Sequence, residues 1–336
     1  MGIYGKNGYI DVNKIKKNPF IVMVGARRTG KTYGVMKYLL ENNARIMYLR
    51  RTTGELDLSM TDSHFAFKVM ENEGRYIKAK KDSKYSYILQ DCETDEIIGN
   101  ATSLTLVAKM RGYDASEITD IMYDEFIPER HVNKISHEGD AVLNMYETIN
   151  GNRELQGAPP VRLWMLANSN NLNSEVLQAF GLVEKIESML KRKQEYSEYR
   201  NITIVLSAES PISKMKENTA LYTAIRSNGK FAEMALHNNF AYNDNSNIAH
   251  EKLIEYVPRC RIGDYVLLDH KSEAKSYFVK NQKIPVAKVY KFSTNSATAF
   301  RIANSDLLNR YIWGRVFFDS WETKNKISEI LPFISS

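Results

Sequence analysis

Cysteine is scarce in this chain of 336 residues, where Cys92 and Cys260 are the only two. Two cysteines exclude a disulfide framework and a zinc site built from several thiolates, and such usage is typical of a reducing compartment. No apolar run approaches the roughly 18 residues of a membrane-spanning helix. The first 17 residues also lack the apolar core of a signal peptide. We therefore expect a soluble, intracellular protein.

The net charge has a small excess of one sign and an uneven distribution. The 46 Lys and Arg residues against 40 Asp and Glu give +6, a modest indication of a polyanionic partner. Much of the excess lies in 271–301, where the only acid is Glu273. The basic residues there are Lys271, Lys275, Lys280, Lys283, Lys288, Lys291 and Arg301. The aromatic residues between them are Tyr277, Phe278, Tyr290, Phe292 and Phe300.

Residues 25–32 read Gly-Ala-Arg-Arg-Thr-Gly-Lys-Thr and follow an apolar run at 20–24. This is the complete pattern G-x-x-x-x-G-K-[ST] of a phosphate-binding loop, in its required place between a strand and a helix. The two glycines let the backbone turn sharply and approach the phosphates, and the amides at the start of the helix point at the anion. The residues predicted to bind the nucleotide are Gly25, Ala26, Arg27, Arg28, Thr29, Gly30, Lys31 and Thr32.

Two side chains of this loop have specific predicted roles. Lys31 would neutralise the β- and γ-phosphates of ATP, and the Thr32 hydroxyl would hold Mg²⁺. The alternative is a chance match, or a glycine turn in a fold that binds no nucleotide. The flanks argue against it, because 21–24 has the continuous apolar character of a buried parallel strand. Behind the loop, apolar residues recur at helical spacing at Met36, Leu39 and Leu40.

A second motif lies in 118–126, an apolar run that ends in Asp124-Glu125-Phe126. A strand with such an end is the usual partner of a phosphate loop. Asp124 would hold Mg²⁺, directly or through water, and Glu125 would polarise the water that attacks the γ-phosphate. The alternative is a pair of solvated acids at a strand end. Asp120 is a rival for the metal role, but it lies at the wrong end of the run.

Further elements surround these motifs. Strands are predicted at 45–49, 85–89, 162–167 and 201–206, and a helix within 140–150 that ends at Gly151. Asn168 follows the strand at 162–167. An amide at this place, beside the metal-binding strand, could sense the γ-phosphate or align water. The alternative is an asparagine that only forms a turn.

The length and a hydrophobic fraction of 43% suffice for a substantial core and favour two domains. We predict a P-loop ATPase domain over residues 1–207, a linker over 208–225 and a C-terminal domain over 226–336. The second domain reads as a small α+β module, with strands at 265–268, 277–279 and 286–290 and helices within 306–318 and 324–330. Its stretch 271–301 would contact a phosphate backbone without reading sequence. The alternative is an inert domain whose basic face is merely solvated.

With both nucleotide motifs in view, the chain resembles the DNA-packaging motor ATPases of small tailed bacteriophages, the phi-29 type. The matching segments are spread along the chain. They are residues 24–33, Tyr48-Leu49-Arg50-Arg51, Tyr123-Asp124-Glu125-Phe126, parts of 143–154, Leu-Ala-Asn at 166–168 and parts of 229–240. A phosphate loop occurs in many proteins, whereas this combination is specific.

The resemblance implies an α/β fold: a RecA-like P-loop ATPase domain with an added strand and a catalytic glutamate, then a linker and an RNase H-like C-terminal domain without nuclease activity. It implies ATP and Mg²⁺ as cofactors. The implied partners are double-stranded DNA, the portal of a prohead and other copies of the chain in a homo-oligomeric ring, typically of five subunits. Some relatives bind a structural RNA. The implied location is the host cytoplasm, transiently at the portal vertex.

Members of this family complete the active site with a basic residue from the neighbouring subunit. A cation there would stabilise the charge that develops on the transferred phosphoryl group. The family's position falls on Gly151 in this chain, a departure from the pattern, with Arg153 two residues further on. A second basic position of the family falls on Arg111. The resemblance therefore implies Arg153 first and Arg111 second, and for each the alternative is a surface or structural arginine.

Other functions fit parts of the sequence. A terminase-like ATPase with an active nuclease would need several converging carboxylates for two-metal cleavage. Asp264 and Asp269 are available, but they form no convincing cluster, so we predict no cleavage. A plasmid-type translocase is a related possibility. A nucleotide-dependent assembly module without motor activity is disfavoured by the complete pair Asp124 and Glu125, and a small-molecule kinase would leave the basic C-terminal half without a purpose.

Overall fold

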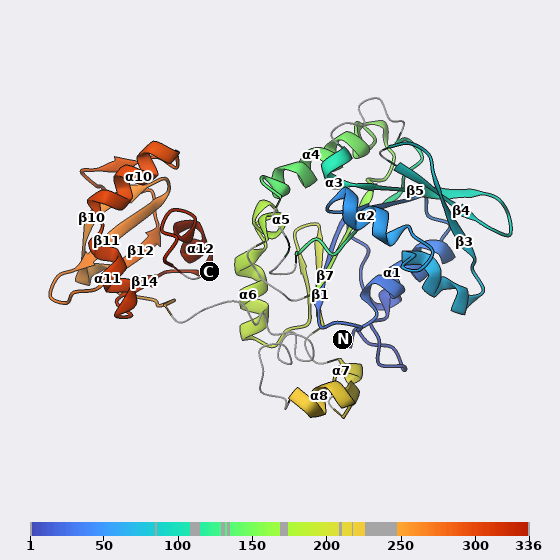
Figure 1. Ribbon diagram of the computed structural model, residues 1–336, viewed down its shortest axis with the longest axis horizontal. Helices are drawn as coiled ribbons and strands as arrows, with labels where there is room; N and C mark the ends of the chain where they lie inside the picture. Colours follow the sequence, from blue (N-terminus) through green and yellow to red (C-terminus); the bar gives the residue numbers. More distant parts are fainter. Residues whose placement is uncertain are drawn as a thin grey trace. The chain divides into compact units, whose positions relative to one another are not determined.

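The computed structural model describes residues 2–84, 86–107, 115–128, 132, 135–168, 174–207, 210–216, 218–225 and 247–334. The chain divides into two compact units, Met1–Ala241 and Tyr242–Ser336, and each contains a sheet with its own helices (Figure 1). The range 208–225, predicted as a linker, contains the short helices α7 (Pro211–Lys216) and α8 (Ala220–Ile225) of the first unit. No helix among the described residues is long and apolar enough to cross a membrane.

The first unit is built on a nine-stranded sheet in the order β3-β4-β5-β2-β6-β7-β1-β9-β8. Within this order, all neighbouring strands of the segment β5-β2-β6-β7-β1-β9 are parallel. At the two edges, β3, β4 and β8 pair antiparallel with their neighbours. The strands are β1 (Phe20–Gly25), β2 (Ile46–Arg50), β3 (Ile77–Lys81), β4 (Ser86–Asp91), β5 (Ile97–Ser103), β6 (Asp120–Asp124), β7 (Arg162–Asn168), β8 (Tyr196–Tyr199) and β9 (Ile202–Ser207).

Helices cover both faces of this sheet, with α1 (Lys31–Glu41) and α2 (Thr53–Ser59) on one side and α4 (Glu138–Asn150), α5 (Glu175–Ala179) and α6 (Val183–Lys191) on the other (Figure 1). This is why the central strands are largely apolar and mostly buried, with polar residues mainly at their ends, since a parallel sheet buries both of its faces. Met23 of β1 and Trp164 of β7 belong to the core on the α1 side. The remaining helical segments are η1 (Val12–Lys14), η2 (Ala66–Glu73), α3 (Leu104–Val107) and η3 (Glu154–Gln156).

The strands predicted at 45–49, 118–124, 162–167 and 201–206 are confirmed as β2, β6, β7 and β9, and 86–89 lies in β4. The helix predicted within 140–150 is confirmed as α4, which ends at Gly151 with φ 51°. In the sheet, β7 lies between β1, which leads into the phosphate loop, and β6, which carries the acid pair. This is the added strand expected of the RecA-like fold.

The second unit has a five-stranded sheet in the order β13-β10-β11-β12-β14. Its strands are β10 (Tyr256–Ile262), β11 (Tyr265–His270), β12 (Ser276–Lys280), β13 (Val289–Tyr290) and β14 (Val316–Phe318). Its helices are η4 (Leu253–Glu255), α10 (Thr294–Ala303), α11 (Asp306–Ile312) and α12 (Trp321–Ser328). A small α+β module was predicted here and is confirmed. The helix predicted within 306–318 ends at Ile312, because Gly314 turns the chain with φ 64° into β14.

Most aromatic residues of the basic stretch 271–301 lie in the core of the second unit. Tyr277, Phe278, Tyr290 and Phe300 are buried in the second unit, where Phe278 stacks on Phe318. Aromatic residues and lysines are interleaved in the strands because successive side chains of a strand point alternately to the core and to solvent. Of these five aromatics only Phe292 is exposed, so any contact of 271–301 with a phosphate backbone falls mainly to its basic residues.

Candidate nucleotide-binding site

The phosphate loop connects β1 directly to α1. Gly30 adopts a left-handed conformation, φ 86° and ψ 13°, at the N-cap of α1, as only glycine does at little cost. Arg28 is also left-handed, with φ 60°. Gly25 has another requirement, because a Cβ on it would lie 1.6 Å from the Ser207 hydroxyl oxygen of β9. The first glycine is therefore fixed by packing between strands as well as by the turn.

The Lys31 side chain lies inside the loop and hydrogen-bonds to its backbone. The side chain is buried, and Nζ donates to the carbonyl oxygens of Gly25 at 3.1 Å and Ala26 at 2.7 Å. The Thr29 hydroxyl donates to the Ala26 carbonyl at 3.0 Å and contacts Ser207 Oγ at 3.2 Å. The loop thus has its backbone held in place around the lysine ammonium, the group that a phosphate would approach.

The second motif meets the loop in space. The Thr32 hydroxyl donates to Asp124 Oδ1 at 3.1 Å, across 92 positions of sequence, and Asp124 is only 7% exposed. Burial raises the pKa of Asp124, and the Arg50 guanidinium acts against that shift. A hydroxyl and a carboxylate at this separation are the oxygen ligands that Mg²⁺ prefers, so the donor set fits that ion.

Arg50, at the end of β2, lies beside both acids. Its Nη2 is 2.6 Å from Glu125 Oε2, and its Nη1 is 3.7 Å from Asp124 Oδ2. Burial lowers the pKa of Arg50, but Tyr48 and the two carboxylates outweigh it and raise the pKa. Glu125 has a half-exposed side chain and a left-handed backbone, φ 56°, a strained conformation of the kind found at functional sites.

A family model described as podovirus DNA encapsidation protein (Gp16) matches residues 4–316. The chain belongs to this family. Among solved structures, it is similar to the Phi-28 gp11 DNA packaging motor, with 16% identity, TM-score 0.60 and 96% of each chain covered. It is also similar to the bacteriophage Phi-29 viral genome packaging motor assembly, with 19% identity, TM-score 0.64, and 94% of this chain and 96% of that one covered. No curated protein matches.

In this encapsidation protein, Asn168 lies where the sequence predicted an amide. It is the last residue of β7, paired in register with Gly25 of β1, and β7 also pairs with β6. Asn168 therefore lies at the same edge of the sheet as the phosphate loop and Asp124, since the parallel strands all end there.

Asp120 is excluded from the metal role by its contacts. It is fully buried at the start of β6, where it accepts two hydrogen bonds from Arg162, at 2.7 and 2.9 Å, and one from Trp164 Nε1 at 2.8 Å. Asp120 is thus a structural carboxylate at the opposite end of the strand from Asp124.

Of the two arginines implied by the resemblance, Arg153 is among the residues that the structure describes. Arg153 donates to the carbonyl oxygens of Ser116 at 2.7 Å and Ile118 at 2.8 Å, in the segment that leads into β6. It is held by its own subunit, at the edge of the sheet away from the phosphate loop. Arg111 lies outside the described residues.

Three residues of the site had no predicted role: Tyr48, Arg50 and Ser207. Tyr48 and Arg50 lie two positions apart on β2, so their side chains are on the same face, and both face Asp124. A signal was present, because two arginines in succession at the end of a buried strand need acidic partners. Ser207 gave no signal, since its role depends on the strand order.

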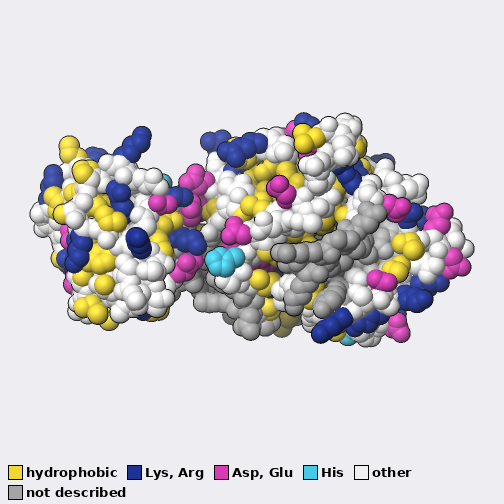
Figure 2. Space-filling model, turned by 90° about the horizontal axis from the view of Figure 1, so that it is seen from above, with side chains coloured by type: hydrophobic (Ala, Val, Ile, Leu, Met, Phe, Trp, Pro, Cys, Tyr) yellow, Lys and Arg dark blue, Asp and Glu magenta, His cyan; other side chains and the backbone are white. Residues whose placement is uncertain are grey.

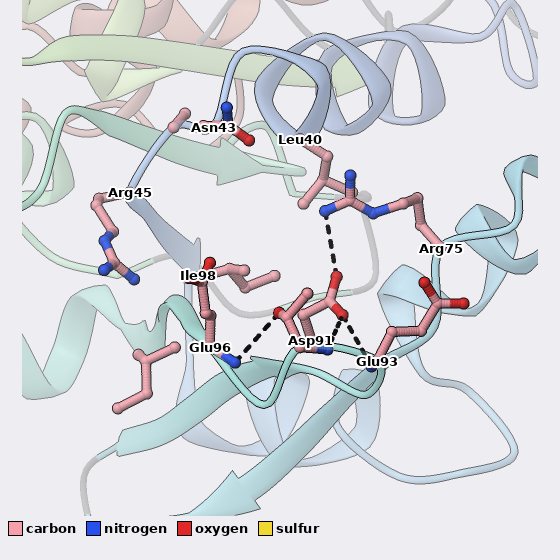
Figure 3. A pocket seen from close by; sticks show the side chains of 11 residues that line it. Leu40, Asn43, Arg45, Arg75, Asp91, Glu93, Glu96 and Ile98 are labelled. Atoms are coloured by element: carbon pink, nitrogen blue, oxygen red, sulfur yellow. Dashed lines mark hydrogen bonds and ion pairs between the residues drawn. The ribbon is translucent and has the colours of Figure 1, made fainter.

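A pocket of about 370 Å³ lies elsewhere in the first unit (Figure 3). It is lined by Arg45 and by the turn between β4 and β5, where Asp91 pairs with Arg75 at 3.1 Å. Arg45 precedes β2, whose other end lies beside Asp124. The pocket is therefore at the opposite edge of the sheet from the phosphate loop and is separate from the nucleotide site.

The acids considered for nuclease chemistry are engaged in the second unit. Asp269 accepts from Arg310 at 2.8 Å and from the Ser276 hydroxyl at 2.8 Å, and Asp264 accepts from Gln282 at 2.7 Å. In the part of the chain that the structure describes, no group of three or more His, Cys, Asp or Glu side chains could hold a metal ion.

Proposed function

We propose that this chain is a Mg²⁺-dependent ATPase that drives double-stranded DNA into a viral prohead as a subunit of a homo-oligomeric ring. The observation that supports it best is the contact between Thr32 and Asp124 at the mouth of the loop held by Lys31. Family membership gives this site its substrate class, since the family is one of DNA encapsidation proteins.

Each residue of the site has one task in this proposal. The amides of the loop and Lys31 bind the β- and γ-phosphates. Thr32 and Asp124 hold Mg²⁺, which when bound neutralises charge on the phosphate oxygens. Glu125 orients the attacking water and accepts its proton. Asn168 contacts the γ-phosphate or that water. Arg50 stabilises two carboxylates that would otherwise repel each other at this sheet edge.

A cation from the neighbouring subunit completes the site in the proposal, with Arg153 as first candidate and Arg111 as second. Arg153 would have to exchange its bonds to the carbonyls of Ser116 and Ile118 for the phosphate. Subunits placed head to tail present such a residue to the next site, a heterologous contact that closes into a ring. Five subunits are proposed by resemblance.

The second unit is proposed to contact DNA, the portal and, if one is present, a structural RNA. Figure 2 shows Lys and Arg side chains over this unit, on the left of the view. Several basic residues of 271–301 are exposed and form no ion pair with another described residue. They are Lys271, Lys283, Lys288, Lys291 and Arg301. Sequence-independent contact with phosphates suits a motor that passes every sequence.

The test is ATP hydrolysis by the purified full chain, with and without double-stranded DNA and cognate proheads, over a range of Mg²⁺ concentrations. We expect turnover that requires Mg²⁺ and rises with both DNA and proheads. Binding of ATP without turnover, even in the assembled state, would leave only a nucleotide-dependent assembly module. Nicking of the DNA in the same reactions would indicate an active nuclease and overturn the assignment of the second unit.

A further inference from the structure

Two consecutive arginines at the end of β2 serve opposite faces of the sheet. Successive side chains of a strand alternate between faces, so Arg50 faces Asp124 and Glu125 while Arg51 faces α4. The same alternation holds in β6, where Asp124 faces the phosphate loop and Tyr123 faces α4. Arg50 and Asp124 thus lie on the face of the candidate site, and their chain neighbours Arg51 and Tyr123 lie together on the reverse face.

The reverse face contains a closed cluster around Glu138, the first residue of α4. Arg51 is 1% exposed and donates to Glu138 through two parallel bonds, Nε to Oε1 at 2.8 Å and Nη2 to Oε2 at 3.1 Å. The buried Tyr123 hydroxyl donates to Glu138 Oε1 at 2.6 Å. Arg51 Nη1 also contacts Glu55 at 3.4 Å. One carboxylate therefore joins the ends of β2 and β6.

Tyr123 and Arg51 are both hydrogen-bond donors in this cluster, and their pKa values fit that role. Burial and the Glu138 carboxylate raise the pKa of Tyr123 well above its ordinary value, so the hydroxyl stays a donor. Burial opposes the charge of Arg51, but the hydrogen bonds and charge of Glu138 raise its pKa overall. Tyr123 and Arg51 therefore both keep their protons near neutral pH.

A gain in stability is a poor explanation for this arrangement. Replacing a buried ion pair by apolar side chains of similar size is often neutral or stabilising, because desolvation offsets the attraction. The cluster instead fixes the positions of the ends of β2 and β6 relative to each other. Tyr123 immediately precedes Asp124, and Arg51 immediately follows Arg50. Any shift of Glu138 therefore displaces both strand ends that form the acid site.

The other end of α4 is tied to the same strand. Arg153, just beyond α4, donates to the carbonyl of Ile118 before β6, and Val161 N donates to Asn150 Oδ1 at the last residue of α4. Strand β6 and helix α4 are thus joined at both ends.

We infer that Arg51, Tyr123 and Glu138 are positioning residues that set the place of Asp124 and Glu125 relative to the phosphate loop and link that place to the first turn of α4. The inference rests on the proposed ATPase function. None of the three residues contacts the phosphate loop in the described structure, and each acts through the acid pair.

The main test compares Tyr123→Phe with Tyr146→Phe. Both changes remove one hydroxyl that is hydrogen-bonded near α4, but Tyr146 donates to the Val161 carbonyl, away from the acids. Misplacing a reacting group slightly costs about tenfold to a hundredfold in rate. We expect kcat of Tyr123→Phe to fall by this amount with KM for ATP within about twofold, and Tyr146→Phe to keep its kcat. Equal kcat in Tyr123→Phe and wild type would overturn the inference, while wild-type turnover in the same assay reports separately on the proposed function.

A second pair of measurements separates positioning from folding. Amide hydrogen exchange of peptides spanning 120–126 should rise in Tyr123→Phe while that of 31–41 stays unchanged, a readout that needs no hydrolysis. In the variant that combines Arg51→Met and Glu138→Met with Tyr123→Phe, no buried hydroxyl loses its acceptor. Its melting temperature should stay close to wild type, since apolar side chains replace the ions, whereas kcat stays low. Recovery of kcat together with the melting temperature would mean that the cluster is only structural.

Discussion

Arg50 Nη2 lies 2.6 Å from Glu125 Oε2, so the glutamate that follows Asp124, the proposed metal ligand, has a cationic partner in its own subunit. The ion pair joins the end of β2 to the residue after β6, beside the strand end that carries Asp124. It fixes the direction of a side chain that is otherwise half exposed. Glu125 is therefore oriented by the fold and also keeps access to water.

The first prediction concerns Glu125→Gln. The amide keeps the size of the side chain and can still accept from Arg50, but it cannot take a proton from water. We expect kcat to fall by about 10² to 10⁴-fold and the affinity for a non-hydrolysable ATP analogue to change little, because the phosphate loop is untouched. Single-turnover hydrolysis and analogue titration measure the two quantities. Near-normal turnover would remove Glu125 from the mechanism.

The second prediction concerns pH and Asp124→Asn. Burial raises the pKa of Asp124 in the folded chain. A raised pKa means that the folded state binds the proton more tightly, so the group stabilises the fold at low pH and loses that contribution as pH rises through the folded pKa. The ligand-free Asp124→Asn variant should thus melt above wild type on the alkaline side of this transition. The difference should shrink as pH falls, since both side chains are then neutral.

Thermal unfolding from about pH 4 to pH 9, without nucleotide or Mg²⁺, checks this. Glu125→Gln is the matched control, because the Glu125 side chain is half exposed and its neutralisation relieves little desolvation. In the presence of ATP analogue and Mg²⁺ the order should reverse, since only wild type keeps the carboxylate ligand. Identical dependence of the melting temperature on pH for Asp124→Asn and wild type would contradict a raised pKa of the buried Asp124 carboxyl.

The sequence predicted the nucleotide site through motifs whose geometry is local. The glycines, Lys31 and Thr32 form one turn, and Asp124 ends an apolar strand, so residue types and spacing were sufficient. The parallel strands β1, β2, β6, β7 and β9 were predicted because strands buried on both faces are largely apolar. The parallel strand β5, which contains Gly99, Asn100 and Thr102, was missed. Resemblance supplied the added strand, which in the structure is β7 between β1 and β6.

What the sequence could not predict depends on contacts between distant segments. The cluster of Arg51, Tyr123 and Glu138 needs the alternation of two strands and the docking of α4. The edge strands β3 and β8 were missed, because their residues are partly exposed and lack an apolar pattern. The aromatic residues of 271–301 were read as part of a binding stretch, although tertiary packing places most of them in the core.

The third prediction separates Asp120 from the metal site. Asp120→Ala leaves Trp164 Nε1 without its acceptor and Arg162 without its partner. We expect the free energy of unfolding to fall by about 3 kcal/mol, somewhat limited because Arg162 is partly exposed. The Mg²⁺ concentration needed for half-maximal turnover should not change. Denaturant unfolding and a Mg²⁺ titration of activity measure the two effects, and a shift in the Mg²⁺ requirement would restore Asp120 as a metal ligand.

The fourth prediction tests why residue 25 is glycine. In the structure, a Cβ at this position would lie 1.6 Å from Ser207 Oγ and 2.8 Å from Ser207 Cβ. Gly25→Ala alone should therefore destabilise the fold by about 1–3 kcal/mol or more through overpacking. Changing Ser207→Gly in the same chain removes both clashing atoms, while the backbone nitrogen of residue 207 remains 3.2 Å away.

The double variant should regain part of the lost stability, so its loss should be clearly smaller than the sum of the losses of the two single variants, as expected for residues in direct contact. Thr29→Val, which removes another hydroxyl that contacts Ser207, controls for loss of polar contacts at β9. Failure of Ser207→Gly to rescue Gly25→Ala would contradict the packing explanation through the Ser207 side chain. If stability were restored but affinity for the ATP analogue stayed lost, glycine would also be needed for the approach of phosphate to the backbone.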